Sequence, residues 1–239
     1  MNQKNRLYLL LGLVSMLTLA FSFSSNTVKK ISMIMVARSN KNGKTATIKS
    51  EMVYQVAGGK MVSHFTQPNN QYIINNAKGE VSIYDPAKNT VIQQVNYIFS
   101  TETTQFYYFL NNQKSDLGLR NMGFTNKATK FEKNLMISTW IAPAKLSKSI
   151  RSVELVHNGG NPIYTKYIDG EGKVMKKVYY YNFQKVGDIE FPLAVTQIDF
   201  FTAKDSVITK TSYTDVKINE AINNELLNFT IPLNAKALK

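Results

Sequence analysis

The chain contains few side chains of the types that commonly carry out chemistry. It has two histidines and no cysteine. His64 and His157 are far apart in the sequence, and neither stands at a spacing typical of metal ligands or beside a nucleophile motif. We therefore interpret both as surface residues of strands, and we predict no metal site and no bound cofactor.

The acidic residues leave one other route to catalysis, because two carboxylates that meet in space can act as a general acid and a general base. Most of them fall in expected turns, where short polar side chains stabilise the bend; these are Asp85, Asp169, Glu171, Asp188 and Asp205. The sequence also lacks G-x-S-x-G, a Walker-type phosphate loop, G-x-G-x-x-G and H-E-x-x-H. We predict no catalytic residues and expect that the protein is not an enzyme.

The N-terminal segment has the pattern of an export signal. Two basic residues precede an apolar run over 7–21, which is short for a membrane span. Small residues suit cleavage near Ser24, so we expect 1–24 to be a signal peptide, with an uncleaved anchor as the alternative. An exported chain without cysteine has neither disulfides nor a lipidated cysteine, and its stability must come from an apolar core.

The formal net charge is +13, and the lysines are spread along the whole chain without a dense basic block. A scattered positive surface usually serves solubility, while attraction to anionic lipid headgroups is the functional alternative. The export signal further disfavours nucleic acid as a partner. We expect a monomer.

Turn signals recur at short intervals, and the residues between them are rich in Val, Ile, Thr, Tyr and Phe. Asn42-Gly43 is the strongest hairpin signal, because both central positions of that turn favour positive φ. The expected strands are 29–39, 44–57, 60–66, 70–75, 79–85, 90–95, 130–141, 151–157, 162–169, 173–184, 189–201 and 206–218. This spacing predicts an antiparallel sheet.

The segment 44–56 shows the clearest alternation. Its even positions include Ile48, Met52 and Tyr54, whereas its odd positions are mostly threonine, lysine, glutamate and glutamine. A strand of this pattern has one dry face and one wet face.

A single helical segment interrupts the strands. Ser100 or Thr101 can cap it, and Phe106, Phe109 and Leu110 share one stripe. A short second turn of helix is expected over 115–121. A curved antiparallel sheet whose dry concave face is covered by this helix satisfies both patterns, so we predict one mainly β domain over 25–239, an incomplete antiparallel barrel with helices covering a hydrophobic cavity.

Several short motifs resemble the periplasmic lipoprotein carrier family, the LolA-like lipoprotein-sorting proteins. They are "MVSHF" at 61–65, Gln67-Pro68 followed by Tyr72, "NNAKGE" at 75–80, "VSIYDP" at 81–86, "VELVHNGGNPIYTKYIDGEGK" at 153–173, "VKIN" at 216–219 and "LNFTIP" at 227–232. The last two resemble the closing strand of that family and its F-x-x-P ending.

The resemblance implies an incomplete barrel that holds lipoprotein acyl chains, or similar lipids, inside a hydrophobic cavity. Two features depart from the family pattern. Gln67 replaces an arginine that the family associates with lid gating and cargo transfer, and glutamine cannot supply a charged fork. The N-terminal helix of the family has no clear counterpart, because 28–38 has the pattern of a strand.

From these patterns we predict which residues bind lipid. Phe106, Phe109 and Leu110 are the candidate lid. The candidate lining, each member of which could equally be ordinary core, is Ile48, Met52, Phe65, Ile73, Val81, Ile83 and Trp140.

The leading hypothesis is a soluble periplasmic carrier of lipoproteins or other acylated cargo, which takes its cargo from an inner-membrane donor complex and passes it to an outer-membrane acceptor. A sensor or regulatory domain of similar fold, which binds lipid or a partner protein but carries nothing, is the second. A lipid-modifying enzyme is the third; clustered carboxylates and histidine at a pocket mouth would support it.

Overall fold

The computed structural model describes residues 27–111, 113–202 and 205–238. The expected signal peptide lies outside these residues. The strands are β1 (Lys30–Lys41), β2 (Lys44–Gln55), β3 (Lys60–Gln67), β4 (Gln71–Asn75), β5 (Glu80–Asp85), β6 (Thr90–Val95), β7 (Thr125–Glu132), β8 (Leu135–Ile141), β9 (Ser152–Asn158), β10 (Asn161–Ile168), β11 (Val174–Val186), β12 (Ile189–Phe200), β13 (Ser206–Ile218) and β14 (Lys236–Leu238). In the described part of the chain the helical elements are α2 (Gln105–Leu110) and four short 3₁₀ helices, η1 (Ala57–Gly59), η2 (Tyr97–Phe99), η3 (Thr101–Thr103) and η4 (Asn219–Ala221).

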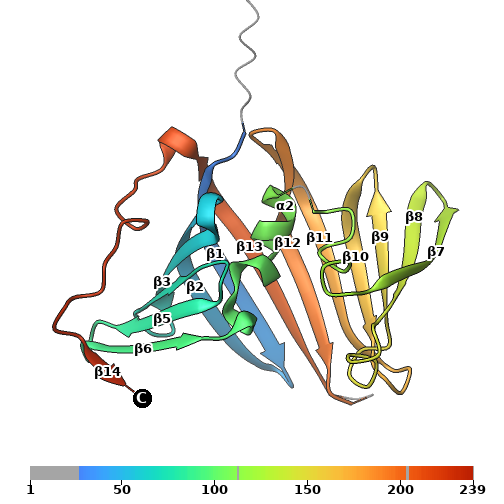
Figure 1. Ribbon diagram of the computed structural model, residues 1–239, viewed down its shortest axis with the longest axis horizontal. Helices are drawn as coiled ribbons and strands as arrows, with labels where there is room; N and C mark the ends of the chain where they lie inside the picture. Colours follow the sequence, from blue (N-terminus) through green and yellow to red (C-terminus); the bar gives the residue numbers. More distant parts are fainter. Residues whose placement is uncertain (1–26, 112, 203–204, 239) are drawn as a thin grey trace, which may run out of the picture.

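All strands belong to one curved, unclosed sheet (Figure 1). Its order is β14-β6-β5-β4-β3-β2-β1-β13-β12-β11-β10-β9-β8-β7. Two antiparallel meanders, β1 to β6 and β7 to β13, are therefore joined where β1 pairs with β13. The expected mainly β, incompletely closed architecture is confirmed, and 30–38 of the segment expected as strand lie in β1.

Two hairpins show how turn residues divide the chain. Asn42 and Gly43 have φ of 50° and 78°, the positive values that the β1–β2 turn requires. Lys133 and Asn134 have φ of 49° and 65° and form an equivalent turn between β7 and β8. The predicted single strand 130–141 is therefore wrong, because a turn without glycine was not recognised in the sequence.

The two faces of the sheet are covered by different segments. Met52 and Tyr54 lie on the inner face. They belong to a large apolar cluster, the inner-face cluster, which includes both phenylalanines of α2. The outer face carries Val53 and Val62, which are buried under Ile222 and Leu227 of the C-terminal segment. The apolar core is thus divided between both sides of the sheet.

The segment between β6 and β7 lies across the inner face, as Figure 1 shows for α2 in front of β12 and β13. The Thr104 side chain caps α2 by accepting from the Tyr107 N–H at 3.4 Å, whereas Ser100 caps η3. The helix therefore begins later than predicted. The expected helical turn over 115–121 is absent from this described segment, because Leu117 and Gly118 have φ of 47° and 75°.

The C-terminal segment crosses the outer face and ends beside β6, where β14 pairs in parallel (red in Figure 1). Phe229 stacks on Tyr72 with ring centroids 3.9 Å apart, and Tyr72 stacks on His64 at 4.2 Å. Of the motifs compared with the end of that family, 216–218 lie in β13, whereas 227–232 lie in the C-terminal segment outside any strand.

Candidate functional site

A cavity of about 550 Å³ lies on the inner face, between the segment around α2 and strands β10 to β13. Its volume falls in the range typical of small-molecule sites, roughly 300–1,000 Å³. The lining residues are Met52, Met61, Tyr97, Thr103, Thr104, Gln105, Phe106, Tyr108, Leu117, Met122, Tyr167, Lys176, Val178, Tyr180, Val195, Gln197, Thr209, Thr211 and Tyr213.

One end of the cavity is closed by aromatic packing under α2. The Phe106 ring lies 5.7 Å from that of Phe191 and 5.8 Å from that of Tyr213, and it also contacts Tyr54 at 6.2 Å. Phe109 extends the cluster away from the cavity and is only 1% exposed. Both rings hold α2 firmly against the sheet, so aromatic side chains close this end, where the polar Gln105 of α2 also lines the cavity.

Tyrosines give the cavity wall hydroxyl groups on an apolar surface. Burial raises the pKa values of Tyr108, Tyr167, Tyr180 and Tyr213 above that of a free phenol. Their hydroxyls are therefore neutral at physiological pH. Such a wall can contact hydrocarbon with its rings and donate hydrogen bonds with its hydroxyls.

The opposite end of the cavity is polar. Thr211 lies opposite Val195, whereas Thr209, next along the same face, lies opposite Gln197. Lys176 follows on β11, opposite Asp199, with 3.6 Å between its Nζ and Oδ1 of that aspartate. Polarity thus increases along the strands with distance from α2.

The structure brings only part of the predicted lining together at this cavity. Met52 and Phe106 line it. Phe109 and Trp140 are buried in the inner-face cluster, and Leu110 packs against that cluster. The remaining predicted residues lie elsewhere: Phe65, Ile73 and Ile83 are partly buried on the inner face of β3 to β5, Ile48 is 37% exposed, and Val81 borders a groove described below.

Gln67 lies at the end of β3, opposite Lys49, and its side chain is exposed. Tyr54, which contacts α2, pairs with Met61 at the other end of the same two strands. The structure thus places Gln67 away from α2. Its gating role stays a prediction.

Sequence reasoning missed the residues contributed by β11 to β13. Lys176, Val178 and Tyr180 on β11 have the same parity, which indicates only that they share one face of the strand. Their neighbours of opposite parity are also aromatic or basic, so hydropathy alone does not distinguish the two faces of this strand.

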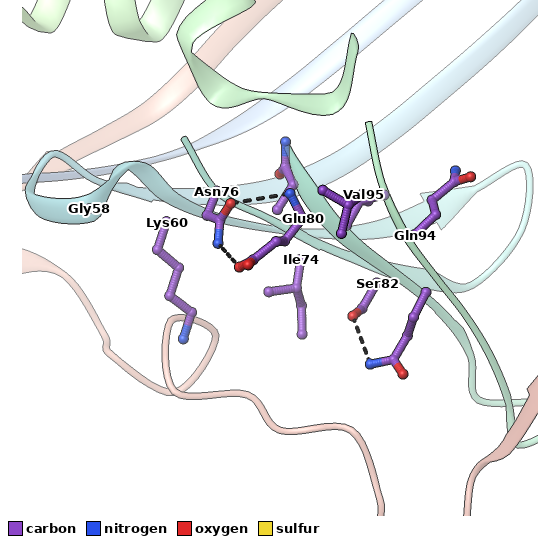
Figure 2. Close-up of a pocket in the computed structure, with 11 residues that line it drawn as sticks. Gly58, Lys60, Ile74, Asn76, Glu80, Ser82, Gln94 and Val95 are labelled. Carbon is purple, nitrogen blue, oxygen red and sulfur yellow. Dashed lines mark hydrogen bonds between the residues drawn. The ribbon is translucent and has the colours of Figure 1, made fainter. Parts of the chain in front are cut away.

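A second groove, of about 630 Å³, lies mainly on the outer face of β3 to β6 (Figure 2). Its polar groups pair with one another: Asn76 donates to Glu80 at 2.6 Å, and Gln93 donates to Ser82 at 3.3 Å. Lys60 donates to the Leu227 carbonyl of the C-terminal segment at 2.7 Å. The groove lacks the enclosed aromatic end of the inner cavity, so we take the inner cavity as the candidate site.

His157 is buried, at 2% exposure, which corrects its interpretation as a surface residue. Its Nε2 lies 3.0 Å from the Lys114 carbonyl, and its Nδ1 is buried without a hydrogen-bond partner among the described residues. Burial lowers the pKa of His157, so the ring is neutral in the folded protein at physiological pH. His64, by contrast, is half-buried and stacked on Tyr72.

In the unfolded chain, His157 takes up a proton near pH 6.5, whereas in the folded protein its pKa is lower and the ring stays neutral at that pH. The free energy of unfolding is therefore expected to fall as the pH drops below about 6.5. The loss amounts to at most about 1.4 kcal/mol per pH unit and ends once the pH passes the lowered pKa. Urea unfolding between pH 8 and pH 5 measures it. A His157→Asn variant should show a shallower slope; an unchanged slope would assign the pH dependence to other groups.

The cavity offers apolar rings, neutral hydroxyls and one lysine, which are groups that can bind a ligand. In residues 27–111, 113–202 and 205–238, no three His, Asp or Glu side chains gather as metal ligands. Within the same residues, no helix has the length and apolar character needed to cross a membrane. The cavity combines an enclosed aromatic end with a polar end, an arrangement that suits an amphiphilic ligand.

Three crystal structures share this architecture over most of the chain. A DUF1329 family protein from Desulfovibrio piger has a TM-score of 0.57 at 10% identity, covering 83% of this chain and 89% of that protein. A LolA superfamily protein from Nitrosomonas europaea has a TM-score of 0.54 at 11% identity, covering 84% and 93%. A domain from Vibrio parahaemolyticus described as outer membrane lipoprotein-sorting has a TM-score of 0.57 at 12% identity, covering 84% and 89%.

The chain therefore has a LolA-like fold, as the sequence motifs predicted. Identities this low show the fold alone. No family model and no curated protein matches the sequence.

Proposed function

We propose that this protein binds the acyl chains of lipoproteins, or of a related lipid, in its inner-face cavity and carries them through the periplasm towards the outer membrane. The observation that supports this proposal most is the cavity of about 550 Å³ under α2, closed at one end by aromatic rings. Its position on the inner face of a LolA-like sheet agrees with this proposal, and one structure of similar fold is described as a lipoprotein-sorting domain.

The energetics need no covalent step. Each methylene removed from water contributes about 0.8 kcal/mol, so a chain of about 16 carbons supplies on the order of 10 kcal/mol before entropy losses. The enclosed end, formed by Phe106 and Tyr213, is where the end of the chain would lie. Binding affinity in this proposal comes from hydrocarbon burial, and the tyrosine hydroxyls contribute specificity.

A carrier must also release its cargo. The predicted lid residues Phe106 and Phe109 are packed into the inner-face cluster, so lifting α2 would expose both rings to water. We infer that cargo leaves through the open polar end while α2 stays in place. Release would then depend on an acceptor that competes for the acyl chain rather than on a lid opening on its own.

The proposed cellular setting follows from the predicted signal peptide over 1–24. The exported protein would receive acylated cargo from an inner-membrane donor and pass it to an outer-membrane acceptor. We propose that it acts as a binding protein without catalysis, since the cavity wall presents neutral phenols rather than an acid and base pair.

Native mass spectrometry of the protein purified from a periplasmic extract tests this proposal. We expect a bound mass of one lipid or acyl-peptide, removed by organic extraction and restored when an acylated peptide is added to the extracted protein. A protein that carries no added mass, and that takes up neither the acylated peptide nor a free lipid, would contradict the proposal.

A further inference from the structure

The cavity contains a feature that hydrocarbon binding alone does not require. Lys176 is the single charged residue among the described residues that line it. Its side chain is 35% exposed, so the lysine is only partly buried in the cavity wall and its ammonium group can stay partly hydrated. A lysine on the wall of a cavity with no other charged lining residue offers a site for an anionic group, beside its ion pair with Asp199.

The present partners of Lys176 leave much of its hydrogen-bonding capacity free. Its Nζ lies 3.6 Å from Oδ1 of Asp199, longer than a normal charge-assisted hydrogen bond. Asp199 is engaged more closely by Gln197, whose Nε2 donates to Oδ2 at 2.7 Å. An ammonium group has three donors, and a ligand oxygen can therefore bind Lys176 while Gln197 continues to hold the aspartate.

The distance along the strand suits an amphiphile. Lys176 and Tyr180 lie on the same face of β11, and roughly 13 Å of strand separates them. Val178 lies between them and lines the cavity, and Tyr180 contacts Phe109 at the aromatic end. A ligand with its head at Lys176 would place its hydrocarbon along Val178 towards α2.

We propose that the ligand is an acyl lipid with an anionic oxygen head, a phosphate or a carboxylate, that binds Lys176 with its chain directed towards Phe106. This inference rests on the proposed function and names the chemical class of the cargo. The head stays partly hydrated at the open end, so it loses little solvation, while the chain supplies most of the binding free energy.

Two probes with the same palmitoyl chain test the proposal: lysophosphatidic acid, which is anionic, and monopalmitoylglycerol, which is uncharged. Both are titrated below their micelle concentrations against a fluorescent acyl probe bound to the delipidated protein. The wild type is expected to bind the anionic lipid about tenfold more tightly, because a hydrogen bond to a charged group contributes that much. Lys176→Gln should abolish this preference without weakening binding of the uncharged lipid.

Lys177 provides a matched control. It is the next residue on β11, is also half-buried, and lies on the opposite face, with its Nζ 5.7 Å from the centre of the Phe200 ring. Lys177→Gln removes the same charge and should keep the tenfold preference, as should Lys176→Arg.

The outcomes separate the two proposals. The proposal of an anionic head group would be overturned if the wild type bound both lipids equally, or if the preference survived Lys176→Gln. Either result would leave the proposal of acyl binding intact. Binding of neither lipid would overturn both. Inorganic phosphate is the third probe in the experiment. If phosphate alone displaces the anionic lipid at comparable concentrations, the site binds a free anion, and the proposal of an amphiphilic ligand is wrong.

Discussion

Replacing Phe109 with alanine is expected to lower the free energy of unfolding by about 3–5 kcal/mol. The side chain is 1% exposed, and its ring lies 5.7 Å from that of Phe191 and 5.9 Å from that of Tyr180. Removing it leaves a void between α2 and the sheet that neighbouring aromatic rings cannot fill without leaving their rotamers. Urea unfolding monitored by circular dichroism measures the change.

Phe131→Ala is the control, because it deletes the same atoms from a ring on β7 that is 76% exposed. Its effect should stay within about 0.5 kcal/mol. If the Phe109 variant were as stable as this control, α2 would contribute little to the folded state. The helix could then act as a freely opening lid, contrary to the release route proposed above.

Alternating hydropathy predicted most of the sheet, because a strand with one buried face must repeat every second residue. The prediction was wrong where both faces of a strand are buried, because the alternation was taken to mean that one face is exposed to water. The odd positions of 44–56 were expected to face water, yet Val53 is 1% exposed. The C-terminal segment covers it with Ile222 and Leu227, and a contact so distant in sequence leaves no local periodic signal.

Only part of the cavity lining could be predicted from the sequence, and its role in binding lipid stays a prediction. Phe106 and Met52 were predicted and do line the cavity, because a helical stripe and an alternating strand each indicate an inward side. Lys176 was not, since the sequence around it reads as a basic strand and the inward face of β11 depends on its register with β12. Register is a tertiary property set by pairing partners, and one sequence does not reveal it.

Filling the cavity is expected to have the largest effect on ligand binding. Thr211 lines the cavity and is only partly buried, so a tryptophan at this position can place its ring in the open space. Excluding about four methylenes of the ligand removes roughly 3 kcal/mol of binding free energy, about a hundredfold in affinity. Displacement of a fluorescent acyl probe, with unfolding midpoints measured in parallel, checks this expectation for Thr211→Trp.

Ser212→Trp introduces the same ring one residue further along β13, where the side chain is exposed on the opposite face of the sheet. It should leave acyl binding unchanged. If both variants bind the probe as the wild type does, the acyl chain does not occupy the inner cavity, and the outer groove beside Ile74 and Val95 becomes the place to look for it. If both lose binding equally, the loss reflects damage to β13 rather than occupation of the cavity, and only a difference between the two variants locates the ligand under α2.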